Sequence, residues 1–388
     1  MKIAYITSHN ILDKSAWSKH EQGLWAASYC ISKHLQDEST FIQNISPINK
    51  SFKVLTKIKW NFYRYFFKKD YYRWAEPIVL KNHALQIQEK LLSCNFDIVL
   101  CPENVIPIAY LNCKQPIVLW TDSTLTSLIN FYPHMSNLCK ENIKNIYDIE
   151  SAALNRCHLV IYTSDWAAQA AIDTYGIPPS KIKVLPWCAN LECNRSLADI
   201  QSIVAAKSSS PCKLLFLGVN WVRKGGDIAL QVVQELNNMG LTTELIVVGC
   251  IPKLSQALQK YVRVIEFIDK SNQEDLEKLN QLFLEAHFLI LPSLADCTPI
   301  VFSEANSFGL PVISTNIGGI PTIIKDDLNG KTFSKDASLR DYCSYIYYLI
   351  NNYSEYTKLA LSSFQQYQSR LNWATAVNNA KEFMRQLI

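Results

Sequence analysis

Residues 288–315 have the sequence FLILPSLADCTPIVFSEANSFGLPVIST, and this stretch decides the fold. An apolar run at Phe288–Leu291 comes before a helix-like segment, and a second apolar run follows at Val312–Ser314. Short runs that are apolar at every position are typical of parallel strands covered on both faces, with helices as the connections. The stretch therefore predicts a strand–helix–strand unit of a parallel α/β sheet.

Runs of the same kind recur along the chain in two series. The first is Ile3–Ile6, Ile98–Cys101, Ile117–Trp120, Leu159–Tyr162 and Ile182–Leu185; the second is Leu214–Leu217, Leu245–Val248, Val262–Phe267, Phe288–Leu291 and Val312–Ser314. Two series in 388 residues predict two doubly wound, Rossmann-like domains. We expect them at 1–190 and 212–365, with a linker at 191–211 and a C-terminal helix at 366–388 that packs back toward the first domain.

Composition narrows the class of protein. Apolar residues make up 48% and charged residues 19%, which favours a large buried core over disorder. The net charge of +4 is too small to indicate a nucleic-acid partner. The 12 cysteines are scattered without zinc-like spacing, so we expect reduced core thiols and no metal. The N-terminus lacks the pattern of a signal peptide and no apolar run reaches the ~18 residues of a membrane span, which favours a cytoplasmic protein.

Glycine placement points to the second domain as the nucleotide binder. Nine of the 11 glycines lie beyond residue 200, and glycine marks places where backbone turns sharply or approaches a ligand. After the strand ending at Leu217, a loop carries Gly218, Arg223 and Lys224 ahead of a helix expected near Asp227. Two cations and a helix N-terminus at the carboxyl end of a parallel strand suit a diphosphate. A solvated basic turn is the alternative.

A second group of polar residues follows the strand at Phe288–Leu291. Asp296 and Glu304 are eight residues apart, and carboxylates can accept from sugar and ribose hydroxyls. Backbone N–H groups of Thr298, Ile300 and Val301 are placed to hold phosphate at the start of the helix. The alternative is that the acids merely favour a helix N-terminus, which explains Asp296 but not Glu304, about two turns in.

These two groups, in this order, resemble the family 4 glycosyltransferases, a large retaining group with the GT-B fold of two Rossmann-like domains facing across a cleft. The acid–x7–acid block is followed by Gly309-Leu310-Pro311-Val312, as in that family, and the resemblance is convincing over about residues 155–330. It implies that Glu304 holds the donor ribose and that Asp296 binds the transferring sugar. It also implies that Arg223 and Lys224 neutralise the diphosphate, and that Phe267 and Ile268 contact the base.

The sequence also departs from the family pattern. The first acid of the block is usually Glu, and Val219 stands where an arginine is usual. Asp122, after the strand Ile117–Trp120, occupies a position where a histidine is common. The glycine pair expected after the first strand is replaced by a loop between Ser8 and Gly23. We place this loop on the acceptor or membrane side of the protein, with the candidate residues His9, Trp17 and Lys19.

Missing motifs complete the functional prediction. The chain has no Asp-x-Asp motif and no GxGxxG, which counts against a metal-bridged donor and against nicotinamide or flavin. We therefore expect a metal-independent enzyme without a cofactor. The family resemblance implies that it moves a sugar, with retention, from a nucleotide-diphosphate sugar to a saccharide, lipid-linked or protein acceptor. A GT-B sugar-nucleotide epimerase and a non-catalytic sugar-nucleotide-binding protein are the alternatives.

Residues 52–74 mix seven cations with ten aromatic residues and a single acid, Asp70. One interpretation is a helical hairpin with its aromatic residues inward and its cations outward. Another is contact with an anionic membrane surface or a polyanionic acceptor, with Lys68 and Lys69 among the contacts. Binding of nucleic acid is the least favoured. The second interpretation would make the protein peripheral at the inner face of a membrane.

Overall fold

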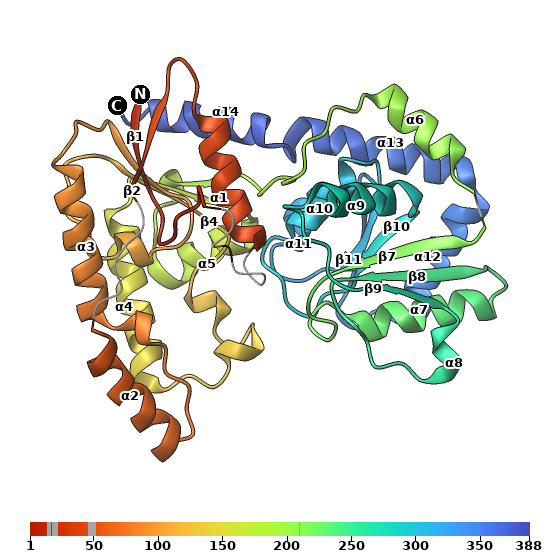
Figure 1. Ribbon diagram of the computed structural model, residues 1–388, viewed down its shortest axis with the longest axis horizontal. Helices are drawn as coiled ribbons and strands as arrows, with labels where there is room; N and C mark the ends of the chain where they lie inside the picture. The colour runs from red at the N-terminus through yellow and green to blue at the C-terminus, as the bar shows by residue number, and fades with distance from the viewer. Residues whose placement is uncertain (14–16, 18–21, 46–51, 209) are drawn as a thin grey trace. The chain divides into compact units, whose positions relative to one another are not determined.

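A computed structural model describes residues 1–13, 17, 22–45, 52–208 and 210–388 of the chain. These residues form two compact units (Figure 1). The first unit comprises Met1–Pro186 with Ala376–Ile388, and the second comprises Trp187–Thr375. Each unit is built on its own six-stranded parallel sheet.

The first unit has the strand order β2-β1-β3-β4-β5-β6. Its elements are β1 (Lys2–Ile6), α1 (Gln22–Leu35), β2 (Phe41–Ile45), α2 (Lys53–Phe66), α3 (Pro77–Leu91), β3 (Ile98–Cys101), β4 (Ile117–Thr121), α4 (Lys140–Arg156), β5 (Leu159–Tyr162), α5 (Asp165–Tyr175) and β6 (Ile182–Val184). Short 3-10 helices lie at Arg73–Ala75, Ile106–Ile108, Thr126–Leu128, Pro133–Met135 and Pro179–Lys181.

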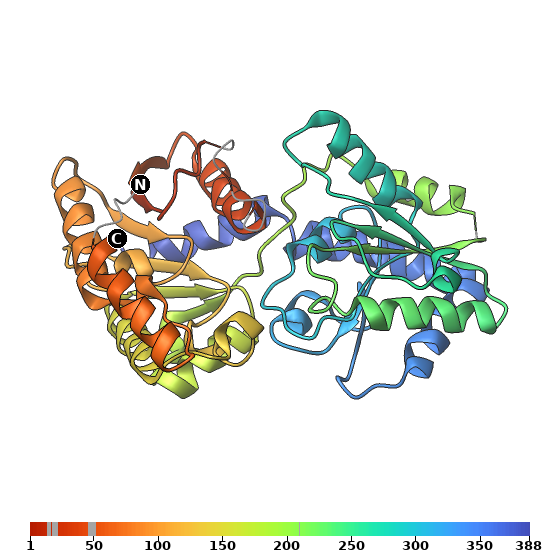
Figure 2. The ribbon, with the colours of Figure 1, turned by 60° about the horizontal axis from the view of Figure 1, so that its bottom comes forward.

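Helices cover both faces of this sheet. Figure 2 shows α1 and the end of the C-terminal helix on one side, with α3, α4 and α5 on the other. Every residue of β3, β4 and β5 is buried, which explains why their sequences are apolar without alternation. The C-terminal helix is held to this unit by Lys381, whose Nζ lies 2.6 Å from Asp37 Oδ2.

The second unit has the strand order β12-β11-β10-β7-β8-β9. Its elements are α6 (Leu197–Ala206), β7 (Cys212–Leu217), α7 (Gly226–Asn238), β8 (Thr243–Val248), α8 (Gln256–Gln259), β9 (Val262–Ile265), α9 (Gln273–Glu285), β10 (Phe288–Leu291), α10 (Ile300–Asn306), β11 (Val312–Thr315), α11 (Ile320–Ile323), β12 (Gly330–Phe333), α12 (Leu339–Asn351) and α13 (Tyr353–Arg370); α14 (Trp373–Arg385) begins here and ends in the first unit.

Strand β10 lies at the centre of the second sheet, between β7 and β11. Phe288 pairs with Leu214 of β7, and Leu289 pairs with Val312 of β11. Helix α12 packs on α7 at one face, while α13 packs on α6 and α10 at the other (Figure 1). The carboxyl ends of β7 and β10 therefore meet at one edge of the sheet, where the turns that follow them come together.

All ten predicted strands are present, with ends that differ by a few residues. Strands β2 and β12, the outermost strands on one side of each sheet, were not predicted from the sequence. Their sequences, FIQNI and GKTF, each contain two polar residues, so they do not form the continuous apolar runs that marked the other strands.

Two further expectations differ from the structure. Residues 191–211 are not a free linker: Leu191, Ile200 and Val204 belong to the core of the second unit. The inward packing of aromatic residues in the 52–74 stretch is wrong for α2 and the residue after it, because Phe62, Tyr65, Phe66 and Phe67 are exposed. Across the described residues, none of the helices has both the length and the apolar character that crossing a bilayer requires.

Candidate functional site

The two predicted cations and one predicted acid meet in the second unit. Lys224 Nζ donates to Asp296 Oδ2 at 2.5 Å, and Arg223 Nη1 lies 3.6 Å from the same oxygen. Ser293 Oγ donates to this oxygen as well, at 3.1 Å. All three charged side chains are at most one-fifth exposed. Two cations against one carboxylate give a local excess of positive charge at the carboxyl edge of the sheet.

Glycine makes this meeting possible. Gly225 has a φ of 74°, and a Cβ there would lie 1.9 Å from the carbonyl oxygen of Pro292, just after β10. A Cβ on Gly226 would meet the Trp221 ring at 2.1 Å. The loop after β7 thus lies directly on the segment after β10, which brings Lys224 to Asp296 across 72 residues of sequence. Gly218 starts the loop, and a Cβ there would lie 3.2 Å from Cγ of Lys224.

The second acid, Glu304, is fully buried in α10. Lys270 Nζ lies 2.7 and 2.6 Å from its two carboxylate oxygens. A buried carboxylate without a partner is costly, and Lys270 provides the compensating charge. The Lys270 side chain is 37% exposed, so its amine reaches Glu304 from the surface. Lys270 was not predicted as a site residue, although it lies close after Phe267 and Ile268, which were predicted to contact the base.

The remaining predicted donor residues lie around these pairs. Ile268 is almost buried and Phe267 is half-buried, and both lie in the turn after β9. Ile300 and Val301 begin α10, and the buried Thr298 lies just before it. This helix has seven residues and is preceded by Pro299.

Polar residues of the first unit gather at the carboxyl edge of its sheet. Glu103, after β3, is buried and accepts from Ser8 Oγ at 2.7 Å and from the Ser8 backbone N–H. His9 Nδ1 lies 2.8 Å from Ser8 Oγ and 3.9 Å from Glu103 Oε1. The His9 ring packs on Trp25, with 4.4 Å between centroids. Glu103 was not predicted, although its place two residues beyond a buried strand was a usable signal.

Asp122 follows β4, the strand beside β3. Its Oδ1 accepts from Ser123 Oγ at 3.2 Å. The next turn is held by Glu150 of α4, which accepts from the backbone N–H groups of Leu125 and Thr126 at 2.6 and 3.0 Å. Burial raises the pKa of Glu150 to about 7, against the opposing effect of these hydrogen bonds and one from Tyr175. Glu150 thus fixes the backbone beyond Asp122.

The other described residues predicted on the acceptor or membrane side are Trp17, Lys68 and Lys69. Trp17 lies with its ring 6.2 Å from that of Tyr29. Lys19 lies outside the described residues. Lys68 and Lys69 follow α2, are exposed, and are tied to Asn137, which accepts from Lys69 Nζ at 3.0 Å.

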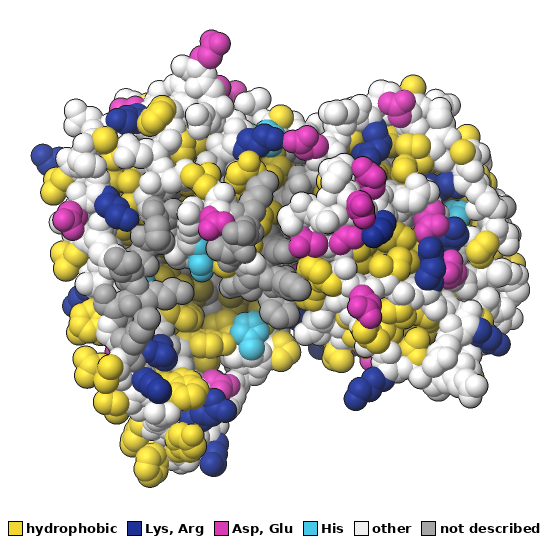
Figure 3. Space-filling model, viewed as in Figure 1, with side chains coloured by type: hydrophobic (Ala, Val, Ile, Leu, Met, Phe, Trp, Pro, Cys, Tyr) yellow, Lys and Arg dark blue, Asp and Glu magenta, His cyan; other side chains and the backbone are white. Residues whose placement is uncertain are grey.

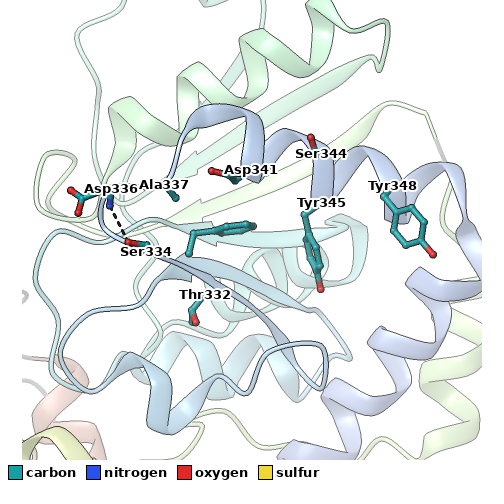
Figure 4. A pocket seen from close by; sticks show the side chains of 9 residues that line it. Thr332, Ser334, Asp336, Ala337, Asp341, Ser344, Tyr345 and Tyr348 are labelled. Atoms are coloured by element: carbon teal, nitrogen blue, oxygen red, sulfur yellow. Dashed lines mark hydrogen bonds between the residues drawn. The ribbon is translucent and has the colours of Figure 1, made fainter.

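A separate hollow of about 640 Å³ lies between β12 and α12. Figure 4 shows Tyr345 and Tyr348 of α12 on one side of it and Thr332 on the other. It includes none of the residues singled out from the sequence, and its lining carries no cation. It is therefore distinct from the charged edge of the sheet.

Residues 211–352 match the family model for glycosyl transferases group 1. The chain has the GT-B fold. A sucrose-phosphate synthase from Thermosynechococcus elongatus superposes with a TM-score of 0.69 at 15% identity, covering 100% of this chain and 98% of that one. The Anabaena protein HepE, solved with UDP, superposes with a TM-score of 0.65 at 16% identity, over the whole of both chains.

Among curated proteins, a D-inositol 3-phosphate glycosyltransferase from Acidothermus cellulolyticus is 25% identical over 185 residues, which is 44% of this chain and 41% of the relative. The chain spans about half or less of the length of the first curated relatives that it matches. The comparisons agree with the predicted fold and support a glycosyltransferase enzyme.

Proposed function

We propose that this protein transfers a sugar from a nucleotide-diphosphate sugar to an acceptor hydroxyl, with retention and without a resident metal ion. The observation that carries the proposal is the cluster of Arg223, Lys224 and Asp296. A diphosphate leaving group gains negative charge as its bond to the anomeric carbon breaks. Preorganised cations in a mostly buried site stabilise that charge, which is the role a metal ion plays elsewhere.

Glu304 supplies the second element of the donor site. Its two oxygens can accept from the two ribose hydroxyls of a nucleotide, as the family resemblance implies. In the free protein Lys270 occupies both oxygens, so donor binding exchanges an ion pair for two hydrogen bonds. The displaced ammonium group then adds a third cation near the nucleotide.

The transfer breaks the bond between the anomeric carbon and a diphosphate oxygen and forms a bond to the acceptor oxygen. The acceptor hydroxyl loses its proton in the same process, and the departing diphosphate takes up that proton. Asp122, His9 and Glu103 are the acceptor-side groups of the first unit that could orient this hydroxyl. A saccharide, a lipid-linked saccharide and a protein all present a suitable hydroxyl. HepE is described with UDP, so a uridine nucleotide is the first donor class to examine.

A thermal-shift screen with UDP-, GDP- and ADP-sugars in EDTA tests the proposal, because a ligand bound only to the folded state raises its apparent stability. We expect one donor class to stabilise the wild type and to fail with Glu304→Ala. Lys224→Ala should lower kcat by about 10²- to 10³-fold, as for loss of one donor to a developing anion. Lys213→Ala is the matched control, since its ion pair with Glu285 involves the first residues of β7, at the opposite edge of the sheet.

Turnover at the wild-type level in either site variant would refute the proposal. Binding of a donor without any turnover would indicate a binding protein instead. Conversion of the donor sugar in the absence of an acceptor would indicate an epimerase.

A further inference from the structure

Helix α2 is attached to the first unit through its polar residues. Lys59 Nζ lies 2.9 Å from Glu76 Oε1 and 2.6 Å from Glu141 Oε1. Tyr63 donates its hydroxyl hydrogen to Glu141 Oε2 at 2.6 Å. Thr56 is buried and accepts from Arg73 Nε at 2.9 Å. The inward face of this helix thus carries an ammonium group and two hydroxyls.

The outward face of α2 is apolar. Six of its large side chains are between 47 and 77% exposed: Val54, Leu55, Ile58, Phe62, Tyr65 and Phe66. Their spacing places them on one side of an α-helix. We call these six side chains the α2 surface. The amphipathic character of the helix is therefore inverted relative to an ordinary surface helix, which buries its apolar side. In both ribbon views α2 lies at the outside of the first unit (Figures 1 and 2).

Such a patch indicates a binding partner. Single exposed apolar residues are normal, but a contiguous stripe along one helix marks an interaction site. No other part of the described chain covers the stripe, because each of the six side chains is exposed. The helix keeps its apolar side free by forming its ion pairs on the other side.

Cations border the α2 surface. Helical periodicity puts Lys57 and Arg64, seven residues apart, along one flank of the stripe. Arg64 lies over the Trp60 ring at 4.9 Å, and its charge remains exposed. Lys68 and Lys69 follow at the C-terminal end, also exposed. Figure 3 shows hydrophobic side chains intermingled with Lys and Arg side chains over the lower part of this unit, where α2 lies.

We propose that the α2 surface docks on an anionic lipid bilayer with the helix axis parallel to the membrane. The apolar side chains would enter the headgroup and acyl boundary, where aromatic rings are favoured. Lys57, Arg64, Lys68 and Lys69 would then lie at the level of the lipid phosphates. A second copy of the chain fits less well, because a symmetric pairing of two such stripes brings the same cations of both copies together.

Co-sedimentation of the full chain with vesicles tests this inference, which is independent of the transfer activity. One set of vesicles is phosphatidylcholine alone, and the other contains phosphatidylglycerol as well. We expect the protein to pellet with the anionic set at low salt and to be released as salt is raised. The variant Ile58→Glu with Phe66→Glu should bind at least tenfold more weakly. Replacing Lys57, Arg64 and Lys68 by Gln should abolish the preference for anionic lipid.

Matched controls keep the result specific. One control is Leu92→Glu, which changes an exposed leucine at the end of α3. The other replaces Lys81, Lys90 and Lys114 by Gln and so removes three exposed cations outside α2. Both should leave vesicle binding unchanged. All variants alter exposed side chains, so their unfolding temperatures should equal that of the wild type. Absence of binding to anionic vesicles at low salt would overturn the inference. A second result would also overturn it. In that case the wild type would not bind vesicles, would sediment as a dimer in sedimentation velocity, and would become a monomer in the variant Phe66→Glu.

Discussion

Lys270 lies in the turn after β9 and Glu304 lies in α10, which follows β10, yet the lysine amine contacts both oxygens of the buried carboxylate. A charge buried this completely depends on its partner, because removing one member of a buried pair leaves the other uncompensated. Donor binding, as proposed, would replace this lysine by ribose hydroxyls. The ion pair between Lys270 and Glu304 is therefore expected only in the donor-free protein.

Lys270→Met should destabilise the donor-free protein by about 3 kcal/mol, the usual cost of leaving a buried charge without its partner. Saturating donor should restore part of this loss, so the donor-induced rise in Tm should be larger in the variant than in the wild type. Differential scanning calorimetry with and without donor measures both quantities. Equal donor-induced shifts in the two proteins would mean that Lys270 and the donor do not compete for Glu304.

Gly225→Ala should disrupt the cluster of Arg223, Lys224 and Asp296. The added Cβ would lie 1.9 Å from a backbone oxygen, and the φ of 74° adds strain, so we expect a loss above about 2 kcal/mol together with weaker donor binding. Gly240→Ala separates the two causes, because Gly240 also has a positive φ, of 88°, but open space around it. That control should cost only about 1 kcal/mol and leave donor binding intact. Urea unfolding of both variants, with donor titrations, makes the comparison.

Continuous apolar runs made most of the fold predictable from sequence. Strands such as β10 are buried on both faces, so each position had to be apolar, and the helical segments between them fixed a parallel sheet. The edge strands β2 and β12 face solvent on one side and carry residues such as Gln43 and Lys331. Their identity as strands depends on pairing with a neighbour, which a local pattern does not contain.

The site was predictable to the extent that it follows strand ends. Arg223 and Lys224 were predicted as one group and Asp296 as part of another, and the structure brings the two groups together because β7 and β10 are adjacent. The pairing of Lys270 with Glu304 was not visible, since it joins the turn after β9 to α10, and strands β7 and β8 lie between β9 and β10. The orientation of α2 was likewise hidden. The orientation is set by Glu76 and Glu141, which lie outside residues 52–74.

Glu150 predicts a pH dependence of stability. Its pKa in the folded protein is raised by burial from 4.5 to about 7, so the folded state holds a proton that the unfolded state has lost. Stability from this group is therefore fully present below about pH 4.5 and declines as pH rises toward 7, by about 3 kcal/mol in all. In Glu150→Gln, an uncharged amide replaces the carboxyl group, and that decline should disappear. Chemical unfolding of both proteins from pH 4.5 to 8 checks this, and parallel curves would contradict the assignment.

Glu103 offers a test of the acceptor side that leaves the donor site intact. Glu103→Gln keeps the size of the side chain but removes the charge beside His9 and one acceptor for the Ser8 groups. If these residues orient the acceptor hydroxyl, kcat/KM for the acceptor should fall by about 10- to 100-fold, corresponding to about 1–3 kcal/mol. The donor-induced thermal shift should not change, because the donor residues belong to the second unit. Glu89→Gln, on α3, is the matched control. If the acceptor kinetics of Glu103→Gln equal those of the wild type, Ser8, His9 and Glu103 only stabilise the turns after β1 and β3.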